Sequence, residues 1–407
     1  MEVKIFELNS QIKVAYLQSQ SEVIHAGLMV GVGSRDDDKE FAGLSHFIEH
    51  MWFKGTCNRS SLQIINDIES LGGDFNAYTS KEETCVHISL LKNSFSVALD
   101  VLSDIYFNSI FPADELIKER EVIIDEIESY EDSPSELIFD DFEELLFKGH
   151  SLSQSILGSR KSLQKISSEI MANHYNNRFL QAPVVISFVG NVPFDVFEKE
   201  LRFFFVDSLI TIECNALNES ITLSAPFNVV KNKKTTQSHC VIGCEAYSWN
   251  NPNRLSLAML SSIIGGPQFS SILNYSLREK HGLTYTVESS YTPYVDTGCL
   301  SIYFGTEKKK ITACLDIIKS EFKRICETDL FDKEIIGYKK QLLGQLALSY
   351  DNNLSLMLSH AKSVLVFGKV DSFADLTIKI QSIDASTLKS VANELLVFDK
   401  MSQLLYS

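Results

Sequence analysis

Residues 43–53 read Gly43-Leu44-Ser45-His46-Phe47-Ile48-Glu49-His50-Met51-Trp52-Phe53. On a helix, His46 and His50 lie one turn apart and project from the same face, so one nitrogen of each imidazole can bind a single tetrahedral Zn²⁺. Glu49 faces the same side and is suited to take a proton from metal-bound water. The segment therefore predicts a metal-binding helix that carries a general base. Two histidines on a solvated helix are the alternative interpretation.

A catalytic zinc site has three protein ligands and one open coordination position. Residues 119–127 predict a helix whose buried face is marked by Val122, Ile123, Ile127 and Tyr130. Both Glu119 and Glu126 fall on that face, where an unpaired carboxylate would be costly. A metal ion bound by one carboxylate, and a hydrogen bond from a metal-binding histidine to the other, would remove that cost. The helical period leaves open which of the two contacts the metal.

The hydrophobic pattern predicts an α+β protein with two similar domains, each a mostly antiparallel sheet with helices packed on it. In the first half, strands are predicted at 12–17, 26–32, 74–78, 85–90 and 184–189, and helices at 44–53, 62–71 and 113–148, the last broken near Pro134. In the second half, strands are predicted at 239–244, 282–287 and 298–305, and helices at 254–264 and 308–367. Residues 207–228 lose periodicity and predict a linker between a zinc-binding catalytic domain, 1–210, and a second domain, 225–407.

The two halves predict a duplication. Aligning 29–35 with 242–248 places His46 opposite Met259 and His50 opposite Ile263. The second domain would then be homologous to the first, with apolar side chains in place of the metal ligands. Superposing the two halves tests this hypothesis.

The length of the chain predicts the number of its domains, and its net charge limits the classes of partner. A chain of 407 residues predicts two domains of roughly 200 residues each. Its 37 basic and 53 acidic residues give a net charge of −16, which disfavours nucleic acids and anionic membranes as partners. That charge could attract basic peptides, although a role in solubility alone is the simpler interpretation.

Three features predict a cytoplasmic location. The sequence from Met1 to Phe6 lacks the pattern of a signal or transit peptide. No apolar run reaches the ~18 residues that a membrane span needs. The eight cysteines form no C-x-x-C motif and predict buried free thiols in a reducing compartment, with disulfides as the alternative.

The segment around the histidines resembles the pitrilysin family of zinc metallopeptidases. That family includes insulin-degrading enzyme, mitochondrial processing peptidase and short bacterial peptidases of about this length. The motif is the inverted zinc motif H-x-x-E-H. The resemblance covers nearly the whole chain, with matches at Gly33-Ser34-Arg35, Gly43 to Met51, Phe53-Lys54-Gly55-Thr56, Gly72-Gly73-Asp74-Phe75-Asn76-Ala77-Tyr78-Thr79 and Lys118-Glu119-Arg120.

The resemblance implies roles for several residues. It selects Glu126 as the third metal ligand and matches Glu119 to a carboxylate that supports the metal ligands. Asn76 matches an active-site asparagine, for which a turn or strand-end residue is the alternative. Ala77 and Tyr78 match an edge strand that pairs with extended substrate, a mode that demands little of the substrate sequence.

The second half matches the family at Leu277-Arg278-Glu279-Lys280-His281-Gly282-Leu283-Thr284-Tyr285. The resemblance implies that Arg278 and Tyr285 reach the substrate carbonyl, where negative charge develops. A surface arginine with a half-buried tyrosine is the alternative. Since one chain holds both this pair and the metal motif, the resemblance implies a homodimer in which each zinc domain faces its partner's second domain across an enclosed chamber.

Two departures from the family pattern limit its use. Gly265-Gly266 is followed by Pro267-Gln268-Phe269-Ser270-Ser271, without the long glycine-rich loop of the processing peptidase, so trimming of targeting presequences is not expected. Trp52 stands where a smaller apolar residue is common and predicts a packing role.

The sequence as a whole predicts a zinc-dependent endopeptidase with one Zn²⁺ per chain, acting on peptides or unfolded polypeptide segments. His46, His50 and Glu126 would hold the metal, and Glu49, Glu119, Arg278 and Tyr285 would serve catalysis. Mn²⁺ and Co²⁺ are alternative metals. The alternatives in function are a non-catalytic subunit of a peptidase heterodimer and a structural zinc protein.

Overall fold

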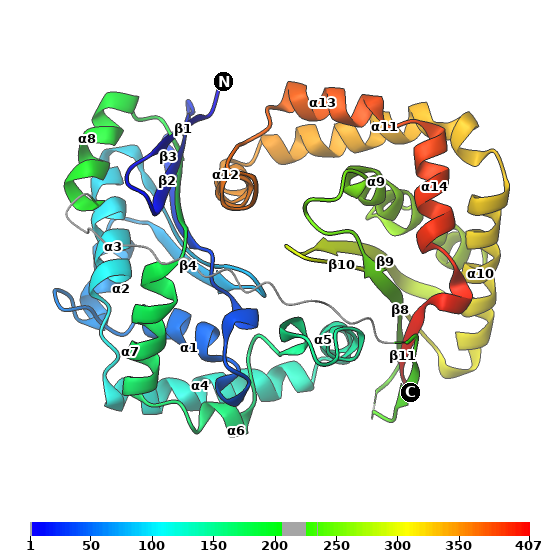
Figure 1. Ribbon diagram of the computed structural model, residues 1–407, viewed down its shortest axis with the longest axis horizontal. Helices are drawn as coiled ribbons and strands as arrows, with labels where there is room; N and C mark the ends of the chain where they lie inside the picture. The colour runs from blue at the N-terminus through cyan, green and yellow to red at the C-terminus, as the bar shows by residue number, and fades with distance from the viewer. Residues whose placement is uncertain (1, 206–224, 234) are drawn as a thin grey trace. The chain divides into compact units, whose positions relative to one another are not determined.

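The computed structural model describes residues 2–205, 225–233 and 235–407 (Figure 1). These residues form two compact units, each with one β-sheet and helices packed on it. The first unit comprises residues 2–128, 154–205 and 348–372, and the second comprises 129–153, 225–233, 235–347 and 373–407. The predicted α+β class with two similar domains is confirmed. The predicted linker at 207–228 lies mostly outside the described residues.

The first unit contains a six-stranded sheet in the order β1-β2-β6-β3-β5-β4. Its strands are β1 (Lys4–Glu7), β2 (Ile12–Gln18), β3 (Val23–Val30), β4 (Asp74–Thr79), β5 (Thr84–Leu91) and β6 (Val184–Gly190). Strands β2 and β6 pair in parallel and the other neighbours are antiparallel. Strand β4 therefore forms one edge of the sheet, next to β5.

The first sheet is buried on both faces. On one face Leu28 and Val86 join the core formed with α1 (Leu44–Met51) and α3 (Phe95–Asn108). On the other face Met29 and Val185 pack with α12 (Asn353–Phe367). The remaining helices of this unit are α2 (Ser61–Glu69), α4 (Ala113–Glu131), α6 (Arg160–Leu163), α7 (Ser168–Asn177) and α8 (Phe194–Phe205).

The second unit repeats this topology. Its sheet has the order β7-β11-β8-β10-β9, with β7 and β11 parallel and the other neighbours antiparallel. The strands are β7 (Asn228–Lys231), β8 (Ser238–Ala246), β9 (Thr284–Pro293), β10 (Gly298–Thr306) and β11 (Ser402–Tyr406). Order and direction match the series β2-β6-β3-β5-β4 of the first sheet strand by strand. This match supports the predicted duplication.

The second sheet is also covered on both faces. Ile242 and Ile302 pack with α9 (Arg254–Gly265) and α10 (Ile311–Glu327), whereas Val241 and Leu404 pack with α5 (Pro134–Leu146). The other helical segments are a π-helix (Asn274–Lys280), α11 (Leu330–Tyr350), α13 (Phe373–Ser382) and α14 (Ala385–Leu395). Short 3₁₀ segments occur in both units. In the first unit they lie at Ser34–Asp36, Lys39–Phe41, Lys92–Ser94 and Phe179–Gln181, and in the second at Ser151–Ser153, Lys308–Lys310 and Phe398–Lys400.

One helix from each half of the chain packs on the sheet formed by the other half. Helix α5 follows α4 in the chain but packs on β8 and β11 of the second sheet, and α12 packs on β3 and β6 of the first (Figure 1). The continuous domains 1–210 and 225–407 therefore depart from the compact units at these two segments. The physical reason is that each sheet has two apolar faces, and the helices next to it in the chain cover only one.

Two further predictions meet the structure here. The seven described cysteines are free; Cys57 is exposed, which corrects the prediction of burial for that residue. Among the described residues, no helix combines the length and apolar character required to cross a bilayer.

Candidate metal centre

Helix α1 begins at a tightly anchored turn. Gly43 has φ of +91°, and a Cβ atom there would come within 2.6 Å of the Leu157 carbonyl oxygen, so glycine is required. The buried carboxylate of Asp37 accepts hydrogen bonds from Gly43 N at 3.0 Å, Ser45 N at 3.0 Å and Ser45 Oγ at 2.6 Å. A carboxylate at this position satisfies free N–H groups and is favoured by the helix dipole. The turn and Asp37 thus fix the start of the helix that carries His46.

Three side chains converge as metal ligands would. The Nε2 atoms of His46 and His50 lie 3.8 Å and 3.5 Å from Oε2 of Glu126. In a tetrahedral site with bonds of about 2.1 Å, ligand atoms are about 3.4 Å apart. One ligand atom from each residue falls within 4.8 Å of the others, and the described residues contain no other such group of three or more. The donor set and its spacing fit Zn²⁺.

The electrostatics of this group favour a cation. Burial and the neighbouring His50 lower the pKa of His46 to about 4, which keeps its imidazole neutral, as a metal ligand must be. Burial lowers the pKa of His50, but hydrogen bonds to Glu126 and Glu119 outweigh it, so that the pKa is raised overall. The hydrogen bond to His50 holds the pKa of Glu126 below its ordinary value. The carboxylates thus stabilise positive charge at this position.

The helical period could not distinguish Glu119 from Glu126 as the metal-binding residue, and the structure gives the two glutamates different contacts. Glu126 faces both Nε2 atoms and its side chain is 45% exposed, so one side of an ion bound there would be accessible. Glu119 is buried, with Oε2 3.2 Å from Nδ1 of His50 and Oε1 2.5 Å from Nζ of Lys54. The predicted stripe is wrong at Val122, which is 49% exposed. Helix α4 instead buries Leu116, Glu119, Ile123 and Ile124.

Glu49 lies beside this group, as a general base would. It is 9% exposed, and Thr79 Oγ1 donates a hydrogen bond of 2.6 Å to its Oε2. Burial raises the pKa of the Glu49 carboxyl, which makes the carboxylate a stronger proton acceptor. Trp52, just after the helix, is fully buried and donates a hydrogen bond to the Tyr175 hydroxyl, as a packing residue would.

The strand that carries Asn76, Ala77 and Tyr78 is an edge strand. Only β5 pairs with β4 among the described strands. The exposed Asn76 side chain accepts a hydrogen bond of 2.8 Å from Ala77 N. Because side chains alternate along a strand, Asn76 and Tyr78 point to the face opposite Thr79, and Tyr78 packs against the cluster that α12 covers. The edge suits main-chain pairing, but these two side chains point away from α1.

Arg278 and Tyr285 belong to the second unit. Arg278 lies on the π-helix, with its guanidinium carbon 4.8 Å from the ring centre of Phe269. Tyr285, on the edge strand β9, is 81% exposed rather than half-buried. Both side chains can therefore meet an extended ligand, and their roles stay predictions.

Sequence reasoning missed three supporting residues: Asp37, Lys54 and Thr79. Lys54 and Thr79 lie inside stretches that carry the family resemblance, which was their only signal. Asp37 gave no such signal, because it lies six residues before the N-cap residue Gly43 and reaches the start of α1 only through the folded chain.

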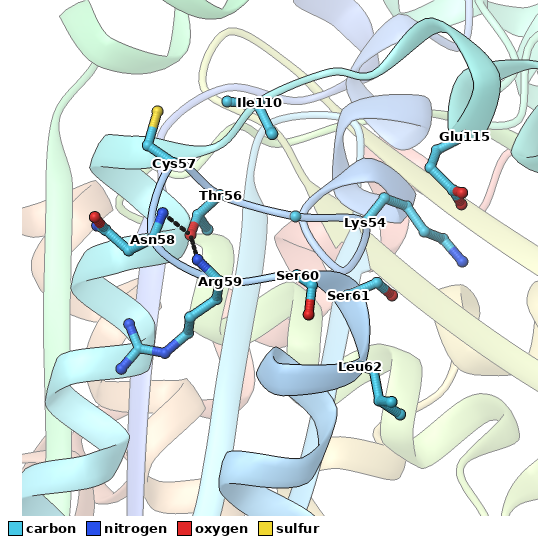
Figure 2. Close-up of a pocket in the computed structure, with 11 residues that line it drawn as sticks. Lys54, Thr56, Cys57, Asn58, Arg59, Ser60, Ser61, Leu62, Ile110 and Glu115 are labelled. Carbon is cyan, nitrogen blue, oxygen red and sulfur yellow. Dashed lines mark hydrogen bonds between the residues drawn. The ribbon is translucent and has the colours of Figure 1, made fainter.

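A cavity of about 460 Å³ lies next to Lys54 and does not include the three candidate ligands (Figure 2). Figure 2 shows Thr56 within it, accepting hydrogen bonds from Asn58 N and Arg59 N. The Arg59 guanidinium is engaged by Asp67, Asp100 and Asp104. The charges of this cavity are thus satisfied within the protein, which suits a structural role.

Comparisons with known proteins agree with this geometry. Residues 13–160 match the family described as insulinase (peptidase family M16), and residues 165–342 match the peptidase M16 inactive domain. The chain is 31% identical to a Bacillus subtilis protein named uncharacterized zinc protease YmxG, over 92% of this chain and 90% of that protein. It is 26% identical to the beta subunit of mouse mitochondrial-processing peptidase, over 97% and 82% of the two chains.

Solved structures share the fold. A protease from Helicobacter pylori superposes with a TM-score of 0.88 at 18% identity, covering 100% of this chain and 99% of that one. A chain of Complex III2 from Candida albicans superposes with a TM-score of 0.85 at 16% identity, covering 100% and 96%. At these identities the likeness shows the fold alone.

Proposed function

Because the chain belongs to the insulinase family, peptidase family M16, we propose that it is a zinc-dependent endopeptidase with one Zn²⁺ held by His46, His50 and Glu126. The observation that carries the proposal is the approach of both histidine Nε2 atoms to the same carboxylate oxygen, on its exposed side. Relatives named zinc proteases support the metal.

In the proposed reaction, a Zn²⁺ ion held by His46, His50 and Glu126 would supply polarisation of the scissile carbonyl and a lower pKa for the attacking water. Glu49 accepts the proton of that water at its carboxylate and transfers it to the leaving amine. Glu119 orients the His50 imidazole through Nδ1, so that Nε2 presents its lone pair. Arg278 and Tyr285 would stabilise negative charge on the carbonyl oxygen. Strand β4, through Asn76, Ala77 and Tyr78, would hold the peptide in extended form by main-chain pairing.

We further propose that the substrates are peptides or unfolded segments, cleaved in an enclosed chamber of a cytoplasmic homodimer. Main-chain pairing at a strand edge requires an extended substrate, which supports this class. Comparing cleavage of one small protein in its native and its reduced, carboxymethylated form tests it. Preferential cleavage of the unfolded form is expected, and equal rates would contradict the chamber.

The central experiment compares the zinc-loaded wild type with Glu49→Gln on an internally quenched peptide. We expect Glu49→Gln to keep one Zn²⁺ per chain by elemental analysis and to lose turnover at least about 100-fold, as the loss of a general base does. Glu121→Gln, an exposed glutamate on α4, is the matched control and should behave as wild type.

Two outcomes separate the alternatives. A zinc-loaded wild type that cleaves no peptide would favour a non-catalytic subunit of a heterodimer, since the family also includes a domain described as inactive. A Co²⁺-substituted protein with a closed tetrahedral spectrum, unchanged by small inhibitors, would favour a structural zinc protein.

A further inference from the structure

Thr79 stands at the end of β4 and touches the proposed base directly. Its hydroxyl donates a hydrogen bond of 2.6 Å to Oε2 of Glu49, across 30 positions of sequence. Glu49 is 9% exposed, and no other hydrogen bond to its carboxylate is found among the described residues. One carboxylate oxygen is thus fixed by Thr79, and Oε1 is left to meet a proton.

The strand geometry aims Thr79 at α1. Side chains alternate along β4, so Phe75, Ala77 and Thr79 share one face. The rings of Phe75 and Phe53 lie 4.6 Å apart, which shows that this face looks toward the end of α1. Thr79 is therefore presented to Glu49 by regular strand geometry.

The protein holds both ends of this hydrogen bond through one segment, Ser34–Asp36 with Asp37. On the hairpin side, Ser34 N and Arg35 N donate to the carbonyl oxygens of Ser80 and Lys81, each at 3.0 Å. The Arg35 guanidinium also pairs with Glu82 at 2.5 Å, and both side chains are 9% exposed.

On the helix side, Asp37 accepts hydrogen bonds from Gly43 N, Ser45 N and Ser45 Oγ, as described above. The β4–β5 turn and the start of α1 are consequently tied to consecutive residues. Such bracing limits relative movement of Thr79 and Glu49, and catalytic groups need this because small displacements of a reacting group are costly in rate.

We propose that Thr79 is a positioning residue for the reaction: its hydroxyl holds Glu49 in the rotamer that directs Oε1 to the attacking water. This inference rests on the proposed function of Glu49. It differs from a packing role, since valine would pack equally well on the strand and would leave the carboxylate unheld.

The test compares Thr79→Val, Thr79→Ser and Thr84→Val in the zinc-loaded full chain. Thr84 is the cross-strand partner of Thr79, and its buried hydroxyl donates to the Val32 carbonyl oxygen at 2.8 Å. Thr84→Val thus removes a threonine hydroxyl from the same hairpin without touching Glu49.

We expect Thr79→Val to lower kcat about 10- to 100-fold, with KM within about 2-fold of wild type and one Zn²⁺ retained. Thr79→Ser should keep kcat within about 3-fold, because it keeps the hydroxyl. Thr84→Val should lower the melting temperature but leave kcat unchanged. Thr79→Ala replaces Thr79→Val if the latter fails to fold.

A second readout is independent of turnover. Crystal structures of metal-free wild type, Thr79→Val and Thr79→Ser should show the Glu49 side chain ordered in the first and third and displaced or disordered in the second. If the wild type is active and Thr79→Val has the same kcat as the wild type, the inference is overturned while the peptidase proposal stays intact. Equal kcat losses in Thr79→Val and Thr84→Val would overturn the inference in the same way. An inactive wild type would instead count against the peptidase itself.

Discussion

The Glu119 carboxylate contacts His50 through the imidazole nitrogen that does not face Glu126. Its Oε2 lies 3.2 Å from Nδ1 of His50, whereas Nε2 of the same ring lies 3.5 Å from Glu126. The other Glu119 oxygen is 2.5 Å from Lys54 Nζ, so the carboxylate is held from both sides. A hydrogen bond donated by Nδ1 selects the tautomer in which Nε2 carries the lone pair.

Glu119→Gln should therefore weaken metal binding without removing a ligand. The neutral amide is a poorer acceptor for Nδ1–H and loses the ion pair with Lys54. We expect zinc affinity to fall about 10- to 100-fold, measured by competition with a chromophoric chelator. Glu121→Gln on the same helix is the control. An unchanged affinity in Glu119→Gln would mean that His50 is oriented by packing alone.

Much of the fold could be predicted because the strands, and the helix α1 that carries His46 and His50, show a regular hydrophobic period in the sequence. Strands β2, β5 and β10 lie within a few residues of their predicted positions, and the helix predicted at 113–148 is divided at Pro134, the first residue of α5. Helix α3 (95–108) was not predicted. Nor was β11, because its sequence Ser402-Gln403-Leu404-Leu405-Tyr406 sets two leucines side by side and shows no clean alternation of apolar and polar residues.

The hydrophobic pattern of the sequence could not predict which helix packs on which sheet, or which distant side chains come into contact. An apolar stripe on α5 or α12 predicts burial but does not name the sheet, so the exchange of these helices was not predicted. The contacts of Thr79 with Glu49 and of Lys54 with Glu119 join distant segments and follow no period. Glu126 was placed on a buried stripe by its spacing, but α4 leaves the core there, and the carboxylate is exposed.

A second prediction concerns pH and helix α12. Burial lowers the pKa of His360 to about 4, and the residue is 3% exposed. Since the unfolded chain has a histidine pKa near 6.5, the unfolded state binds the proton more tightly. The contribution of His360 to stability is thus complete above pH 6.5 and is lost as the pH falls toward 4. Between pH 7 and pH 5 this loss is about 2 kcal/mol.

His360→Gln should remove that part of the pH dependence. The free energy of unfolding of metal-free protein is measured in urea at pH 7 and pH 5, in a Trp249→Phe background. The chain has two tryptophans, so Trp52 then reports the first unit alone. The difference between the two pH values should shrink by about 2 kcal/mol in His360→Gln. An unshrunk difference in His360→Gln would place the protonation elsewhere.

The last prediction tests whether the proposed homodimer shares its active sites. Glu49→Gln removes the proposed base from the first unit, and Arg278→Ala removes the proposed oxyanion-stabilising group from the second. If each site combines Glu49 of one subunit with Arg278 of the other, a mixed dimer contains one site with both residues intact. If each site lies within one chain, neither site of the mixed dimer is complete.

Co-expressing the two variants with different affinity tags, and purifying through both tags in turn, isolates the mixed dimer. We expect it to recover about half of the wild-type turnover per dimer, whereas each variant alone loses about 100-fold or more. Lys280→Ala, an exposed residue on the π-helix with Arg278, replaces Arg278→Ala in the control mixture. In the control mixture the Lys280→Ala subunit keeps Glu49, and both subunits keep Arg278. One site is therefore complete whether the sites are shared between subunits or lie within one chain, so the control mixture should be active in either arrangement. A mixed dimer of Glu49→Gln and Arg278→Ala that stays inactive while the control mixture is active would exclude shared sites, because the two mixtures differ only in which basic side chain of the π-helix, Arg278 or Lys280, is removed.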